Sequence, residues 1–414
     1  MRVIEPSQLK HLKKKSKNPK RPKLVVPSLL ILLIFSVYVL WASLRSLPLI
    51  HPLVDKLPIL PASSTAVSWP AYGQAAVGTL EEGLLARNGE TKPVSVASIT
   101  KLITALSVLQ KHPLKLNEQG PSITLDATDI GYYTYYASND GSVVRVVAGE
   151  QISEYQALQA ILLPSANNMA DTLARWAFGS LEAYLSYADT LVQQYGMKNT
   201  SVKDASGFTD STTSTAEDLI ILGKKALQHP VIAQIVAQQN AEIPIAGTIN
   251  STNALLSSGM IGIKTGNTDR AGGCYLFAST SEVQPGRSVT IIGAVLSAPT
   301  LTDAMKSAVP LLSSAKQSFT VATVVKAGQV IGTYSTAWGA KATASSKQDL
   351  AVLRWNGTAI NPELSMQSIK SPLSAGTQVG TINALSNGES KTSPVELAPA
   401  LNSPSFKWRL LHPF

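Results

Sequence analysis

The chain has 414 residues, of which 44% are hydrophobic and 15% charged, so its length suits two domains with proper cores and a tail. The formal net charge of +9 would suit a nucleic-acid-binding protein, but residues 1–23 hold nine Lys or Arg against one Glu. The rest of the chain is left with about +1, so the basic character belongs to the tail and no nucleic-acid partner is expected.

An apolar segment follows this tail directly. Residues 24–44 contain no charged side chain, and about 20 apolar residues are enough to cross a bilayer. A secretory signal has a shorter apolar region and a small-x-small cleavage site, whereas Arg45 follows here. We therefore expect an uncleaved transmembrane anchor, with a cleaved signal as the alternative. Because basic flanks stay inside, residues 1–23 are predicted to be cytoplasmic and everything after residue 45 extracytoplasmic, in a single-pass cell-membrane protein.

Five prolines between residues 48 and 70 predict an extended linker over residues 45–71. A first domain is expected over residues 72–313. It opens with two strand-like runs, 74–80 and 84–88, separated by Glu81-Glu82-Gly83, which indicates a hairpin.

Helical and strand-like patterns alternate through the rest of this domain, which predicts an α+β fold. Ser214-Thr215-Ala216-Glu217 resembles a capping box that opens a helix through Leu227. The other expected helices cover 97–109, 155–163 and 167–176, and the expected strands cover 262–265, 274–279 and 289–296.

Short β-rich runs separated by Gly, Ser and Asn replace the helical pattern after residue 316. A weak repeat pairs Gly328 and Gly332 with Gly376 and Gly380, each at an offset of 48 residues. These features predict a small all-β domain over residues 316–414. The alternative for the repeat is a coincidental pair of turns.

Three short motifs carry the chemistry of the chain. A Ser-x-x-Lys pattern also starts at Ser7 and at Ser313, and Ser-x-Asn recurs too, but Lys-Thr-Gly occurs once. Only one set has the right order and an extracytoplasmic position: Ser98-Ile99-Thr100-Lys101, Ser165-Ala166-Asn167 and Lys264-Thr265-Gly266.

The first motif offers a nucleophile and a base. Residues at i and i+3 share a helix face, so Lys101 projects beside Ser98, and the helix start offers N–H groups for an oxyanion. Lysine takes a proton only when neutral, so its pKa must fall roughly 2–3 units from 10.4. Burial and a second cation, Lys264, are the available causes. Taken alone, Ser98 would more often cap a helix and Lys101 would be a solvated lysine.

The other two motifs suit a peptide substrate. Ser165 and Asn167 offer a hydroxyl and an amide in an irregular turn, although capping is the simpler role for Ser165. Glycines flank Lys264 and Thr265, which favours an edge strand along which a peptide can lie, with the two side chains at its carboxylate. No histidine pairing suits zinc and the single Cys274 cannot form an internal disulfide, so we expect neither a metal nor a cofactor.

The three motifs together resemble the penicilloyl-serine transferases, and within them the D-alanyl-D-alanine carboxypeptidases of serine peptidase family S11, which are low-molecular-mass penicillin-binding proteins. The likeness covers about residues 72–300 well and the β-rich tail more loosely. It extends to Pro93–Ala97, Leu162–Pro164, Asp204–Gly207, Ser214–Ala216 with Asp218, and Ala271–Cys274. Asn168 and Ile261 depart from it, because such enzymes often have aspartate there.

The resemblance implies a DD-peptidase/β-lactamase-like catalytic domain that removes the terminal D-alanine of peptidoglycan stem pentapeptides and is inhibited covalently by β-lactams. By motif position, Ser98 would form the acyl-enzyme, Lys101 would be its base and Ser165 would pass the proton to the departing D-alanine. The substrate would be held by Asn167, Lys264, Thr265 and Gly266, and the N–H groups of Ser98 and Asn267 would form the oxyanion hole.

Three rivals remain. A serine β-lactamase would need a deacylating glutamate, and there is none between Tyr184 and Thr215. A DD-endopeptidase or transpeptidase of the same fold would use the same residues. A non-catalytic peptidoglycan-binding relic would usually have lost one of them.

Overall fold

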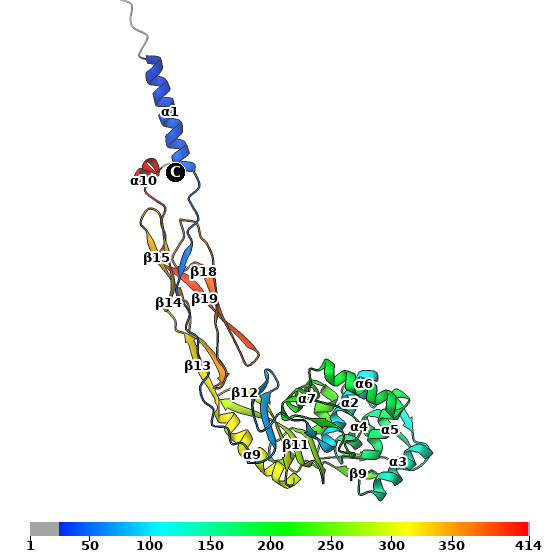
Figure 1. The fold of residues 1–414 in the computed structure, drawn as a ribbon. Coiled ribbons are helices and arrows are strands. Elements are labelled where there is room, and N and C mark those ends of the chain that lie inside the picture. Colours follow the sequence, from blue (N-terminus) through cyan, green and yellow to red (C-terminus); the bar gives the residue numbers. More distant parts are fainter. Residues whose placement is uncertain (1–24, 413–414) are drawn as a thin grey trace, which may run out of the picture.

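The computed structural model describes residues 25–412, so the predicted cytoplasmic tail, residues 1–23, lies outside the described residues. The described chain forms three parts in a row: an apolar helix, a β-rich unit and a mixed unit that holds the motifs (Figure 1). The predicted α+β fold with an all-β C-terminal domain and one N-terminal apolar helix is confirmed.

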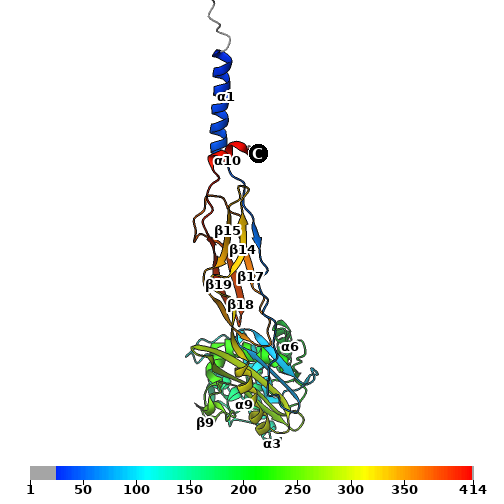
Figure 2. The same ribbon diagram turned by 90° about the vertical axis from the view of Figure 1, so that its left-hand side faces the viewer.

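Helix α1 (Val25–Leu44) has the length and composition to cross a membrane, with a mean hydropathy of 2.2 over Val26–Leu44 and only 6% of that window buried. The short C-terminal helix α10 (Phe406–Leu411) lies beside its end (Figures 1 and 2). Arg409 donates a hydrogen bond to the carbonyl of Ser43 at 2.9 Å, so the C-terminal helix is tied to the end of α1 that leads into the β-rich unit.

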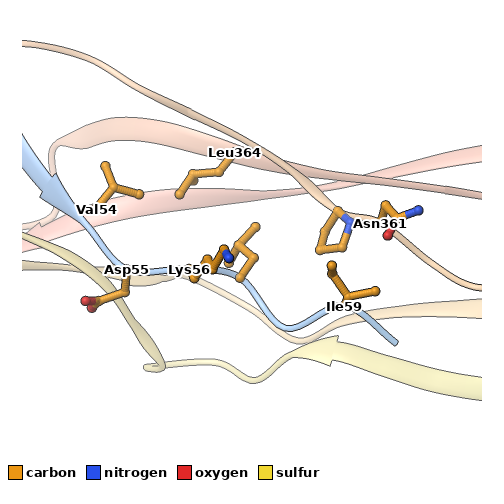
Figure 3. Close-up of a pocket in the computed structure, with 8 residues that line it drawn as sticks. Val54, Asp55, Lys56, Ile59, Asn361 and Leu364 are labelled. Atoms are coloured by element: carbon orange, nitrogen blue, oxygen red, sulfur yellow. The ribbon is translucent and has the colours of Figure 1, made fainter. Parts of the chain in front are cut away.

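The proline-rich segment is extended, but it does not hang free. Strand β1 (Pro52–Val54) pairs with β14 (Val330–Ser335), while Ile50 and Leu60 bridge to Ile369 and Ile360. Between Val54 and Leu60 the segment pairs with no strand of the described chain, and an open cavity of about 490 Å³ lies beside it. Val54, Ile59 and Leu364 help to line this cavity (Figure 3). Composition predicts the extended backbone, and the apolar side chains account for its docking on the β-rich unit.

The β-rich unit contains a six-stranded antiparallel sheet in the order β1-β14-β15-β19-β18-β17 and a separate β13–β16 pair. The weak repeat has a structural counterpart. Gly328 and Gly376 both adopt positive φ, and Gly332 and Gly380 both follow register shifts at the start of strands. The remaining bounds are β13 (Phe319–Val325), β15 (Lys341–Ser346), β16 (Leu350–Trp355), β17 (Glu363–Met366), β18 (Gln378–Ser386) and β19 (Glu389–Ala398).

The mixed unit is built on a five-stranded antiparallel sheet in the order β10-β11-β12-β2-β3. Successive side chains along each strand point to opposite faces of this sheet, and both faces are covered. Helix α7 (Ala216–Gln228) packs on one face and α9 (Leu301–Gln317) packs on the other. The expected hairpin is present, and α9 extends past the expected domain end at Ser313. The strands are β2 (Gln74–Thr79), β3 (Gly83–Asn88), β10 (Gly262–Thr268), β11 (Gly272–Gln284) and β12 (Arg287–Ala298).

A cluster of helices packs beyond α7. The predicted helix over 97–109 divides into a 3₁₀ turn, η1 (Ala97–Ile99), and α2 (Thr100–Lys111), which is buried on every side from Thr100 to Leu109. Thr215, rather than Ser214, caps α7. The other elements are α3 (Ala127–Ser138), α4 (Glu154–Leu162), α5 (Asn167–Phe178), α6 (Leu181–Gln194), α8 (Pro230–Val236), η2 (Leu256–Ser258), and the short pairs β4–β7 (Val94–Ser95, Thr213–Ser214), β5–β6 (Ser122–Thr124, Gln151–Ser153) and β8–β9 (Asn240–Ile243, Gly247–Asn250).

Candidate active site

Ser98 lies in the turn η1, where the chain enters the buried helix α2. Ala97 before it has a φ of +47°, an uncommon conformation for a residue with a side chain. Strand β10 lies directly against this turn, because a Cβ on Gly266 would stand 3.1 Å from the backbone nitrogen of Ser98. The structure thus brings the first and third motifs into contact.

Lys101 is 0% exposed and makes three hydrogen bonds through its Nζ atom. The partners are Ser98 Oγ at 2.8 Å, Asn167 Oδ1 at 2.7 Å and the carbonyl of Ser206 at 2.6 Å. A carbonyl and an amide oxygen can only accept, so they take both N–H groups of a neutral amine. The lone pair is then left for the Ser98 hydroxyl, which is the geometry that a general base requires.

The surroundings of Lys101 favour this neutral form. Its pKa is lowered well below the usual value, first by burial and second by the positive charge of Lys264. The carboxylates of Asp204 and Asp171 oppose these effects and raise the pKa. Both causes expected from the sequence, burial and a second cation, therefore act on this amine.

Lys264 and Thr265 are buried on β10, which is the terminal strand of the five-stranded sheet. Burial lowers the pKa of Lys264 to about 7, and its Nζ donates to the carbonyl of Thr265 at 3.0 Å. An anionic group placed beside this amine would favour the charged form. Thr265 Oγ1 lies 2.5 Å from Thr252 Oγ1, and Thr252 also donates its N–H to the carbonyl of Leu163 at 3.1 Å.

Thr252 was missed by sequence reasoning. It joins the third motif to the loop before the second motif, although it belongs to neither. Only the surrounding chain fold brings these two segments together, so no local pattern could have identified it.

Ser165 does not cap a helix: the N-cap of α5 is Ala166, which makes no side-chain capping bond. Ser165 has a φ of +67° and is 5% exposed, and its Oγ has no hydrogen-bond partner among residues 25–412. A strained, buried serine with an unused hydroxyl is unusual for a purely structural residue. Asn167 begins α5 and donates its N–H to the carbonyl of Ser142 at 2.7 Å.

Asn168, which departs from the family pattern, holds a neighbouring loop. Its Oδ1 accepts from the N–H of Val144 at 3.2 Å, and its Nδ2 donates to the carbonyl of Val144 at 3.1 Å. An ionised aspartate could only accept. The amide therefore suits this position, at the base of the loop that carries Ser142.

Asp204 organises the loop that presents the Ser206 carbonyl to Lys101. It accepts from the N–H of Phe208 at 2.8 Å and from Thr212 Oγ1 at 2.7 Å. Gly207 lies against the nucleophile turn, because a Cβ there would come within 1.9 Å of the carbonyl oxygen of Ala97. The sequence marks this stretch only through the family resemblance and does not indicate which atom contacts the lysine.

An open cavity of about 340 Å³ lies over Ser98, and Asn167 and Asn267 also line it. The site thus combines a serine hydroxyl, a buried amine facing it and an accessible space above, which are the requirements of acyl transfer through a serine ester. Lys101, Ser165, Lys264 and Thr265 are buried and are not among the residues that line this cavity, and Gly266 packs against the turn of Ser98.

Comparisons with known proteins agree with this chemistry. A family model described as D-alanyl-D-alanine carboxypeptidase matches residues 78–300. A D-alanyl-D-alanine carboxypeptidase of Bacillus subtilis is 22% identical over 73% of this chain and 77% of its own length. One from Escherichia coli K12 is 27% identical over 71% of this chain and 74% of its own length. A D-alanyl-D-alanine endopeptidase of Pseudomonas aeruginosa is 30% identical over 53% of this chain and 71% of its own length.

Solved structures share the fold. Penicillin-binding protein 5 of Haemophilus influenzae has a TM-score of 0.56 at 17% identity, covering 82% of this chain and 99% of that one. A peptidoglycan synthesis regulatory factor of Streptococcus pneumoniae, penicillin-binding protein 3, also has a TM-score of 0.56, at 21% identity, covering 82% of this chain and 100% of that one.

Proposed function

The chain belongs to the D-alanyl-D-alanine carboxypeptidase family, peptidase family S11, and from this premise we propose that Ser98 is the nucleophile that removes the terminal D-alanine from peptidoglycan stem pentapeptides. The protein is a serine-type D-alanyl-D-alanine carboxypeptidase. The observation that supports the assignment of Ser98 most strongly is the buried amine of Lys101, which lies 2.8 Å from Ser98 Oγ.

The reaction proceeds in two halves. Ser98 Oγ attacks the carbonyl of the penultimate D-alanine while its proton passes to Lys101 Nζ, and the N–H groups of Ser98 and Asn267 hold the oxyanion. Ser165 then relays the proton that Lys101 has taken to the amine of the departing D-alanine as the peptide bond breaks, which leaves Lys101 neutral again. Water hydrolyses the resulting ester and regenerates Ser98. Asn167 holds the substrate amide, while Lys264 and Thr265 hold its terminal carboxylate and Gly266 keeps the strand close to the nucleophile turn.

Lys264→Ala is expected to move the acid limb of the acylation pH profile to higher pH. Removing the neighbouring cation raises the pKa of Lys101, so a higher pH is needed before this amine is neutral. The limiting rate of acylation by a fluorescent penicillin, measured from pH 5 to 9, provides the profile. An acid limb at the wild-type position would show that Lys264 does not act on the base.

Product analysis tests the substrate assignment. Purified enzyme is incubated with a pentapeptide and, separately, with cross-linked peptide dimers. Release of free D-alanine from the pentapeptide, absent in Ser98→Ala, is the expected result. Conversion of dimers to monomers without D-alanine release would instead support the endopeptidase alternative, which the name of the Pseudomonas relative keeps open.

Hydrolysis of β-lactams is expected to be slow. Membership of this family supports the proposal that β-lactams bind covalently to this chain. Hydrolysis of the bound β-lactam would need a glutamate to activate water, and none lies between Tyr184 and Thr215. Rapid turnover of nitrocefin without release of D-alanine would contradict the peptidase assignment and favour a β-lactamase.

The apolar helix α1 is compatible with a membrane anchor or a signal sequence. We place the chain in the cell membrane as an uncleaved single-pass protein, with residues 1–23 in the cytoplasm and the catalytic unit outside. The uncharged 24–44 segment and its basic flank support this orientation. Protease added to intact spheroplasts should degrade the catalytic unit, and its protection would contradict the topology.

A further inference from the structure

Two buried side chains outside the three motifs lie behind the catalytic lysine. Asp171, on α5, is 7% exposed, and Tyr136, on α3, is 5% exposed. The Tyr136 hydroxyl donates to Asp171 Oδ2 at 2.8 Å and lies 3.4 Å from Ser206 Oγ. The proposed mechanism uses neither residue.

This pair is linked to both residues whose oxygens accept hydrogen bonds from Lys101, to Ser206 through its side chain and to Asn167 through helix α5. Tyr136 touches Ser206, whose carbonyl accepts from Lys101 Nζ at 2.6 Å. Asp171 stands one helical turn after Asn167, whose Oδ1 accepts at 2.7 Å, so the two residues share a face of α5. A shift of the Asp171–Tyr136 pair would therefore disturb the orientation of the lysine amine.

The pair also carries a charge. Burial raises the pKa of Asp171 to about 6, so its carboxyl is largely ionised at neutral pH, and this charge raises the pKa of Lys101. The groups that face Asp171 are Lys101 from α2, Tyr132 and Tyr136 from α3 and Asp204 from the loop after α6. Arg175 on α5 is committed to Asp126 and Asp129.

We propose that Asp171, held by Tyr136, is a positioning residue for Lys101 that keeps the amine aimed at Ser98 and stabilises the ammonium formed when Lys101 takes the Ser98 proton. Asp171 exchanges no proton in this step: the proton moves from Ser98 Oγ to Lys101 Nζ as Ser98 Oγ bonds to the carbonyl carbon of the substrate. The inference rests on the proposed role of Lys101 as base. It assigns a function to two residues that the motifs do not contain.

Asp171→Asn tests the proposal, because asparagine keeps the volume and an oxygen that accepts from Tyr136 but removes the charge. The limiting rate of acylation of the full chain in detergent by a fluorescent penicillin is measured from pH 5 to 9. The acid limb should move to lower pH by at least about 0.5 unit, since Lys101 loses a neighbouring anion. The plateau rate should fall several-fold. The acid limb thus moves in the direction opposite to that expected for Lys264→Ala.

Asp129→Asn is the matched control. Asp129 is also a buried carboxylate, 1% exposed, but it pairs with Arg175 rather than with the Lys101 network. A general effect of removing a buried charge would act in both variants, whereas the proposal expects an unmoved acid limb in Asp129→Asn.

If Asp171→Asn does not fold, Tyr136→Phe tests whether the Asp171–Tyr136 pair acts on Lys101. Losing the hydrogen bond from Tyr136 raises the pKa of Asp171, so the carboxyl is neutral over more of the range and the limb should move in the same direction. An acid limb at the wild-type position in folded Asp171→Asn, or in Tyr136→Phe where Asp171→Asn does not fold, would overturn the proposal. Wild-type protein that is not acylated at all would instead contradict the proposed function.

Discussion

Replacing Lys101 is expected to lower the rate of Ser98 acylation by about 10²- to 10⁴-fold, the usual contribution of a general base. Lys101→Met removes the amine and keeps a side chain of similar length, so Ser98 loses the group that accepts its proton. The carbonyl of Ser206 and Oδ1 of Asn167 lose their donor as well. Stopped-flow acylation by a fluorescent penicillin measures the effect, with circular dichroism to verify the fold.

Lys101→Arg separates the two roles that the residue could play. Arginine carries a positive charge and stays protonated at neutral pH, so it cannot accept a proton. A base role predicts that a folded Lys101→Arg is about as slow as Lys101→Met. Near-wild-type acylation in Lys101→Arg would mean that the site needs a cation beside Ser98 rather than a base.

Gly207→Ala is expected to have the largest effect on stability. Gly207 has a φ of +74°, and a Cβ would meet the Ala97 carbonyl oxygen at 1.9 Å and Thr100 Oγ1 at 2.6 Å. Backbone strain and an overlap with backbone atoms should together destabilise the fold by roughly 3 kcal/mol or more. For a unit of this size that corresponds to a fall in Tm of about 6–12 °C.

Gly286→Ala is the matched control for this variant. Gly286 has a similar φ of +69°, but nothing lies within 4 Å of a Cβ there. It should show the backbone strain alone, about 1 kcal/mol, or a fall in Tm of about 2–4 °C. Equal losses in the two variants, measured by thermal unfolding, would mean that the contact of Gly207 with the nucleophile turn does not matter.

The sequence predicts what is local. The turn signal at Glu81–Gly83 identifies the first hairpin, and the 48-residue repeat marks two turns of the same local structure. The order and spacing of the motifs select Ser98 over Ser7 and Ser313, and the i, i+3 rule places Lys101 beside it. These features depend on neighbouring residues or on a short motif, so they can be read from the chain alone.

What the sequence does not reveal is long-range. The prolines predict an extended segment after residue 45, but not its pairing with β14, because strand pairing depends on residues far away in the chain. Periodicity marks the helix after Ser98, but not its burial on every side. The positive φ of Ser165 and the Tyr136–Asp171 pair also arise only when separate elements pack together.

Identification of the acylated residue tests the central claim most directly. Wild-type protein and Ser98→Ala are incubated with a penicillin, and intact mass and peptide mapping locate the adduct. The account predicts one penicilloyl group on the wild type, in the peptide that contains Ser98, and none on Ser98→Ala. An adduct that persists in Ser98→Ala, or that maps to Ser7 or Ser313, would contradict it.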